Sequence, residues 1–168
     1  MRITAISAAA ALMLLSVSTS LMAQRPDDQI DPKSLALLQE GRAALASGDV
    51  EGAQDAIESA LAVDPRNRQA FVALADIARS RNLPGKAIRL YREALALEPN
   101  DVAALRGQGE ALVAKGATEK AKEVLATVRK VCGAQCGEAN VLAAAIAKGP
   151  PPTATAQAEP LAPETGKP

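Results

Sequence analysis

The chain has 168 residues, 48% of them apolar, yet Phe71 and Tyr91 are its only aromatic residues. Lys plus Arg and Asp plus Glu number 19 each, so the chain lacks the basic excess of a nucleic-acid-binding protein. It contains no His, the commonest general base and zinc ligand. The composition therefore predicts an all-helical, non-catalytic protein.

Residues 1–23 resemble a secretory signal peptide. They have one positive charge at Arg2, an apolar core at Ala8–Leu15 and small residues toward Ala23, where cleavage is expected. The alternative is an uncleaved anchor, because residues 3–23 are uncharged and long enough to span a bilayer. In both cases the rest of the chain is expected to be exported, to the periplasm of a Gram-negative bacterium or into the medium.

Residues 24–33 are polar, contain two prolines and are predicted to be a linker. After them, residues of the same type recur every 34 positions, which divides the chain into units at 34–67, 68–101 and 102–135. A fixed period of this size is typical of a helical solenoid. The recurring positions are Ala53, Ala87 and Ala121; Ala60 and Ala94; Pro65 and Pro99; and Gly48, Asn82 and Gly116.

Each unit is predicted to hold two helices. Gly and Asn tolerate the left-handed conformation that ends a helix, so Gly48, Asn82 and Gly116 are expected in the turns. Pro65 and Pro99 are expected to end the second helices, because a residue before Pro is displaced from the helical region. Small residues on facing helices would allow a close approach: Gly41 with Ala53, Ala75 with Ala87, and Gly109 with Ala121.

This pattern resembles the tetratricopeptide repeat, a 34-residue unit with small residues in both helices, a large apolar or aromatic residue in each, and a Pro at its end. The third unit departs at its end, where Val128 and Gly133 replace Ala and Pro. The resemblance covers residues 34–135. It implies an all-α fold in which three antiparallel helix pairs form a right-handed superhelical array. The matching residues are Gly41, Ala53, Ile57, Ala60, Pro65, Phe71, Leu74, Ala75, Ala87, Tyr91, Ala94, Pro99, Gly109, Ala121 and Leu125.

Residues 136–148 are predicted to form a C-terminal capping helix, because Val141, Leu142 and Ile146 fall on one apolar stripe and repeat arrays need a cap. Residues 149–168 are rich in Pro, Ala and Thr without apolar periodicity. They are expected to be disordered.

Cys132 and Cys136 are the only cysteines. In an exported chain they are expected to form a structural disulfide, because Gly133 would break the helix between them. The alternative is a thiol-redox or Cu(I) site, since soft thiolates bind Cu(I). A closed zinc site needs about four ligands, so no metal or other cofactor is predicted.

In the family that the chain resembles, the first helices of successive units line a concave groove that holds peptides or partner helices. For Leu35, Leu38 and Leu45 of the first unit, the alternative is that they bind no partner and that residues 24–33 merely cover them. Leu38 and Val72 also stand where the family's clamp for a C-terminal carboxylate has basic residues, which argues against a chaperone-tail receptor. The resemblance places these residues in the groove: Leu35, Leu38, Arg42, Leu45, Gln69, Val72, Asp76, Arg79, Ala103, Arg106, Glu110 and Val113.

These observations predict a non-catalytic interaction scaffold of the cell envelope. Its partner would be a peptide or helix of another exported or membrane-associated protein. A nucleic-acid partner is not expected, and the mature chain would not span a membrane if the leader is cleaved. Two alternatives remain open: a thiol-redox or Cu(I) protein using Cys132 and Cys136, and a self-associating module whose repeats stack end to end.

Overall fold

The computed structural model describes residues 29–133 and 136–152. The chain divides into two units, Met1–Ile30 and Asp31–Pro168. The predicted signal peptide, most of the predicted linker and the predicted tail from residue 153 on lie outside the described residues. The described part of the second unit holds α2 (Pro32–Ser47), α3 (Val50–Val63), α4 (Arg68–Ser80), α5 (Pro84–Leu97), α6 (Val102–Ala114), α7 (Thr118–Cys132) and α8 (Gly137–Lys148).

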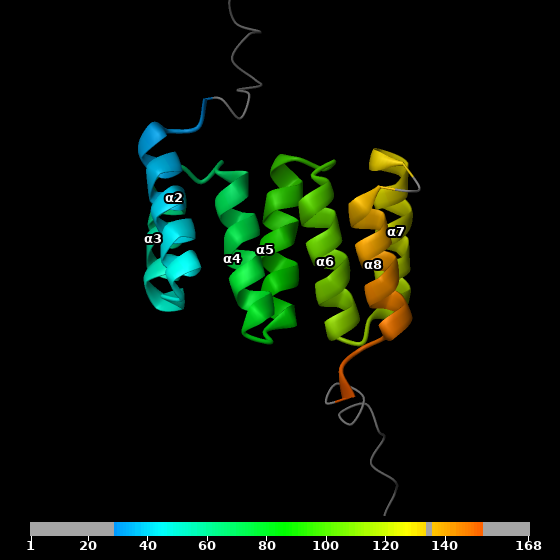
Figure 1. The fold of residues 1–168 in the computed structure, drawn as a ribbon. Coiled ribbons are helices and arrows are strands. Elements are labelled where there is room, and N and C mark those ends of the chain that lie inside the picture. The colour runs from blue at the N-terminus through cyan, green and yellow to red at the C-terminus, as the bar shows by residue number, and fades with distance from the viewer. Residues whose placement is uncertain (1–28, 134–135, 153–168) are drawn as a thin grey trace, which may run out of the picture. The chain divides into compact units, whose positions relative to one another are not determined.

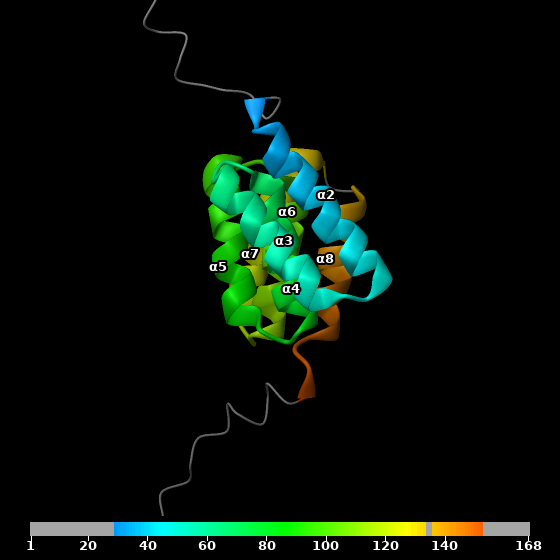
Figure 2. The same cartoon turned by 90° about the vertical axis from the view of Figure 1, so that its left-hand side faces the viewer.

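The helices of the second unit form successive antiparallel pairs (Figure 1). α2 packs on α3, α4 on α5 and α6 on α7, while α8 packs on both α6 and α7 at the end of the row. The first helices of the pairs also contact one another, α2 with α4 and α4 with α6, and viewed along the row the pairs lie behind one another (Figure 2). The predicted all-α fold of paired helices is confirmed, and no strand occurs in the described ranges.

The turns within the pairs have the predicted left-handed backbone. Gly48, Asn82 and Gly116 have φ values of 85°, 56° and 82°, and each follows the first helix of its pair. These three residues reverse the chain so that the second helix of each pair returns along the first.

α3 and α5 also end where Pro65 and Pro99 predict. Asp64 and Glu98, which precede prolines, have extended backbones with φ of −139° and −140°. α2 begins at Pro32, so its first two residues lie in the segment predicted as linker. The Asp31 side chain caps this helix by accepting a hydrogen bond of 2.7 Å from the Lys33 backbone nitrogen.

Small residues allow close helix packing throughout the row. Ala53, Ala87 and Ala121 are completely buried. A Cβ atom at Gly41 would lie 2.4 Å from Ile57 Cγ1, so this glycine is required where α2 meets α3. Gly109 was expected to face α7, but the atoms nearest to a Cβ there belong to Leu142 of α8.

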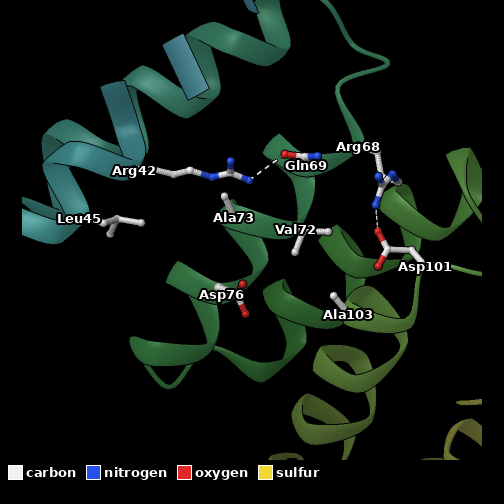
Figure 3. A pocket seen from close by; sticks show the side chains of 9 residues that line it. All are labelled: Arg42, Leu45, Arg68, Gln69, Val72, Ala73, Asp76, Asp101 and Ala103. Carbon is white, nitrogen blue, oxygen red and sulfur yellow. Dashed lines mark hydrogen bonds and ion pairs between the residues drawn. The ribbon is translucent and has the colours of Figure 1, made fainter. Parts of the chain in front are cut away.

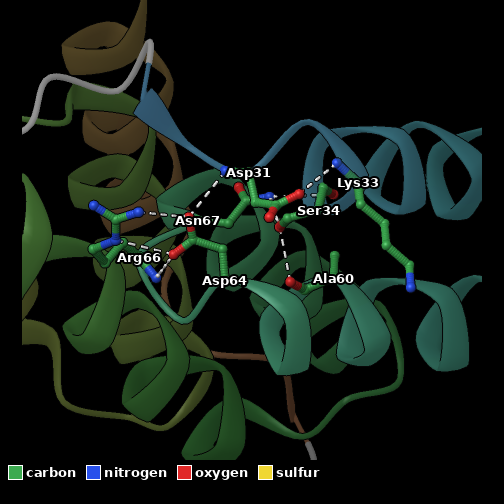
Figure 4. Close-up of polar contacts among 7 residues, drawn as sticks. All are labelled: Asp31, Lys33, Ser34, Ala60, Asp64, Arg66 and Asn67. Carbon is green, nitrogen blue, oxygen red and sulfur yellow. Dashed lines mark hydrogen bonds and ion pairs between the residues drawn. The ribbon is translucent and has the colours of Figure 1, made fainter.

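A buried polar network ties the first pair to the second (Figure 4). Ser34 Oγ donates to the Ala60 carbonyl oxygen at 2.7 Å and accepts from Asn67 Nδ2 at 2.8 Å. Asn67 also caps α4 by accepting from the Ala70 backbone nitrogen at 3.2 Å. Since these buried polar groups are hydrogen-bonded, they fix α2 against the junction of α3 and α4 without the penalty of an unpaired group.

Asp64 lies in the same junction. Its carboxylate accepts from the Asp31 backbone nitrogen at 3.0 Å and from Arg66 Nη2 at 2.8 Å. The hydrogen bond from the Arg66 side chain is the main cause that lowers the pKa of Asp64 to about 2. Asp64 is therefore ionised at neutral pH and holds the start of α2 near the end of α3.

Candidate functional site

A pocket of about 420 Å³ lies on the first helices of the pairs. α2 and α4 supply most of its wall, and the start of α6 closes one end (Figure 3). It lies on the side where the groove was expected. Its lining residues are Arg42, Leu45, Arg68, Gln69, Val72, Ala73, Asp76, Asp101 and Ala103.

The α2 side of the pocket presents a guanidinium beside apolar side chains. Arg42 is exposed, and its Nη2 donates to Gln69 Oε1 at 2.9 Å. In the described ranges Arg42 has no carboxylate partner. Leu45 and Val72 are half-buried beside it. This combination suits a ligand that brings an acidic group and an apolar group together.

The far end of the pocket is held by an ion pair between Arg68 and Asp101. Their side chains are 18% and 6% exposed, so the pair is largely shielded from water. Asp101 also caps α6 by accepting from the Ala104 backbone nitrogen at 2.9 Å. Arg68 and Asp101 thus connect the start of α4 to the start of α6 and shape the pocket.

Beyond the pocket, one ion pair joins α4 to α6, and one further pair lies within each of these helices. Arg79 Nη1 lies 2.8 Å from Glu110 Oε2, and Arg106 Nη1 lies 2.9 Å from Glu110 Oε1. Arg79 Nη2 also lies 3.3 Å from Asp76 Oδ1. Because two arginines and two carboxylates alternate, their charges compensate one another.

The hydroxyl of Tyr91 reaches this network from α5. It donates to Asp76 Oδ1 at 2.6 Å, although the tyrosine itself is completely buried. Burial, followed by the hydrogen bond to the Asp76 carboxylate, raises the pKa of Tyr91 above its ordinary value. Tyr91 therefore stays protonated and positions Asp76 at the pocket wall.

The structure brings together six of the groove residues predicted in the sequence. Arg79, Arg106 and Glu110 form the adjoining ion pairs, while Leu35, which is 40% exposed, does not line the pocket. Three lining residues, Arg68, Ala73 and Asp101, were not predicted from the sequence; the position of Asp101 just before a predicted helix was the available signal. The six predicted residues that line the pocket are Arg42, Leu45, Gln69, Val72, Asp76 and Ala103.

The assignment of Leu38 and Val113 to the groove is wrong. Leu38 is 1% exposed and belongs to the core cluster that contains Ala53 and Ile57. Val113 is 4% exposed and lies in the next core cluster. Both side chains turn into the packed core, so a ligand in the groove cannot reach them.

The two cysteines lie at the connection between α7 and α8. Cys132 ends α7, Cys136 precedes α8, and the pair is at disulfide distance with a Cα to Cα separation of 5.9 Å. Gly133 ends α7 with a positive φ of 91°, and the helix break expected at this residue is confirmed. Both cysteines pack against the core cluster formed by α6, α7 and α8. The geometry is that of a structural cross-link between the last repeat helix and the cap.

No group of three or more Cys, Asp or Glu side chains is placed to hold a metal ion in the described part of the chain. No helix described here combines the length and apolar character needed to cross a membrane.

Two family models, both described as tetratricopeptide repeat, match residues 38–96 and 78–131. Together they span more than half of the chain. No curated protein sequence matches it.

Solved structures share the fold. The first tetratricopeptide repeat domain of Spaghetti (RPAP3), bound to an HSP90 peptide, has a TM-score of 0.64 at 22% identity, covering 69% of this chain and 91% of that one. The Sgt2 domain from Aspergillus fumigatus has a TM-score of 0.64 at 24% identity, covering 81% and 90%. An O-GlcNAc transferase from Thermobaculum terrenum has a TM-score of 0.62 at 26% identity, covering 73% of this chain but 23% of the enzyme.

Proposed function

Since the chain belongs to the tetratricopeptide repeat family, we propose that it is a non-catalytic scaffold that binds another protein. The bound segment is a peptide or helix, and it occupies the groove formed by α2, α4 and α6. The Spaghetti domain, which is similar in fold and was solved with a peptide bound, supports this mode of binding. The likeness to part of a transferase adds no catalytic group to this chain.

The observation that carries the proposal is the pocket itself. Its volume of about 420 Å³ is lined by apolar side chains and by polar groups from separate helices. Such a combination is typical of sites that bury part of a ligand and orient the rest. Arg42 supplies a cation without a carboxylate partner in the described ranges, so it favours a partner segment with an acidic side chain.

The proposed setting is the cell envelope. Residues 1–23 have the charge, apolar core and small residues of a signal peptide, which supports export. The partner is then another exported or membrane-associated protein, and the scaffold would hold that protein in an assembly of the envelope.

The test is affinity capture from the native envelope fraction with the full chain, expressed with its own N-terminal segment, as bait. The groove variant is Arg42→Glu combined with Val72→Asp, which reverses the unpaired charge and places a carboxylate in the apolar wall. Lys130→Glu is the matched control, because this exposed lysine on α7 does not line the groove pocket. We expect one partner to be captured by the wild type and the control, and at least tenfold less by the groove variant.

A photo-crosslinking residue at Ala103 provides the second readout. Ala103 is exposed at the end of the pocket, so a bound segment should crosslink there. Equal capture by all three proteins, with no crosslink at Ala103, would overturn the groove as the binding site. Capture of the chain alone would favour self-association.

A further inference from the structure

A second pocket lies away from the groove, where α5 begins and α6 turns into α7. The turns that precede α5 and α7 lie along the same edge of the row, at the bottom in Figure 1. The pocket has a volume of about 340 Å³. Its apolar lining includes Ile88 and Leu112, and every charged residue that lines it is basic. These basic residues are Arg89, Arg92, Lys115 and Lys120, and we call the site the basic pocket.

The four cations of the basic pocket are exposed, and none forms an ion pair or side-chain hydrogen bond within the described ranges. The neighbouring carboxylate of Glu119 is already paired with Lys122, whose Nζ lies 2.8 Å from Glu119 Oε1. Four like charges around one concavity repel one another and raise the local positive potential. An anion that enters the pocket would relieve this repulsion.

The repeat itself does not require this arrangement. One period earlier, at the corresponding positions between the first and second pairs, the charges are balanced between two acids and two bases. Because the backbone pattern is the same at both places, the excess charge belongs to this one junction and not to the fold. The corresponding residues are Asp55, Glu58, Arg81 and Lys86.

Two helix N-termini add to the positive potential. Gly85, the second residue of α5, and Ala117, the N-cap of α7, both line the basic pocket. Neither helix has a side-chain cap, whereas Asp or Asn side chains cap α2, α3, α4 and α6. An uncapped N-terminus leaves backbone N–H groups for another acceptor, and its dipole favours negative charge.

We propose that the basic pocket binds the phosphate group of a ligand. Arginine forks match phosphate oxygens in bidentate geometry, and Arg89 and Arg92 lie three residues apart on one face of α5. The volume accommodates a small phosphate-bearing molecule or the head group of an anionic phospholipid. This site uses none of the residues that line the groove pocket, so it does not depend on the proposed partner.

The test is an NMR titration of the full chain with inorganic pyrophosphate. We expect saturable shifts centred on the backbone amides of Gly85 and Ala117. Arg89→Gln combined with Arg92→Gln should weaken binding at least tenfold. Arg81→Gln combined with Lys130→Gln removes the same charge outside the pocket and should change the affinity less than twofold.

A second arm identifies the source of the phosphate group. Cosedimentation compares vesicles that contain phosphatidylglycerol with vesicles of phosphatidylcholine alone. Pyrophosphate binding with equal sedimentation would assign a soluble ligand, while pyrophosphate binding with preference for phosphatidylglycerol would assign a lipid head group. Absence of saturable shifts in the wild type, or equal loss in the control pair, would overturn the proposal. Vesicle binding without pyrophosphate binding would overturn it too, because the protein would then recognise only surface charge.

Discussion

At the scale of single residues, Tyr91 shows how a buried side chain shapes an exposed surface. It crosses from α5 beneath α6, and its hydroxyl meets Asp76 at the pocket wall. The crossing is possible because α6 has a glycine at the point of contact. A Cβ atom at Gly107 would lie 2.3 Å from Tyr91 Cζ.

We therefore expect Gly107→Ala to destabilise the fold. The added methyl group must displace the rigid ring of Tyr91, and overpacking of this kind costs about 1 to 3 kcal/mol. Chemical denaturation measures the change. Gly137→Ala is the matched control, because a Cβ at Gly137 has no atom within 4 Å. Equal stability of the two variants would contradict the packing described for Tyr91.

Asp64 predicts a pH dependence of stability. Its pKa is about 2 in the folded chain against an ordinary value of 3.8, so the ionised carboxylate stabilises the fold above about pH 4. That contribution is lost as the pH falls through 3.8 toward 2. Asp64→Asn should lower the melting temperature at pH 6, and the difference from wild type should shrink by pH 2. A difference that stays constant over this range would show that the carboxylate charge is not involved.

At the scale of elements, helix ends and helix faces follow different rules. Gly48, Asn82 and Gly116 end helices because their backbones tolerate positive φ, which is a property of each residue alone. The inward direction of Leu38 depends on where α3 lies, and that depends on the packing of Gly41 against Ile57. The resemblance to the repeat family therefore predicted the positions of the helices correctly, but it predicted the direction of some side chains, such as Leu38, incorrectly.

The cross-link between α7 and α8 can be tested directly. Cys132→Ser combined with Cys136→Ser should lower the free energy of unfolding by about 2 kcal/mol, the chain-entropy value for a loop of about five residues. Thermal unfolding of the variant should match that of the reduced wild type. If the double variant instead keeps the stability of the oxidised protein, the cysteines have no structural role, and Cu(I) titration of the reduced wild type becomes the next measurement.

At the scale of the whole second unit, the row of helix pairs separates two surfaces of different chemistry. The groove pocket combines apolar side chains with charges that are mostly paired, whereas the basic pocket gathers charges that are unpaired in the described ranges. The first suits an amphipathic protein segment, and the second suits a compact anion. The two sites have no lining residue in common, so substitutions in one should leave binding at the other unchanged.

The amino-acid sequence alone predicts the helical class, the period, the turns and the helix ends, because these features depend on backbone preferences within a few residues of Gly48, Pro65 or Pro99. It also indicated most of the groove pocket, since its residues recur on the first helices. The folded structure was needed to show that Leu38 and Val113 are buried. It alone gathered four cations from α5 and from the α6 to α7 region into one pocket. Both outcomes depend on which faces of distant helices meet, and packing between residues far apart in the chain sets those faces.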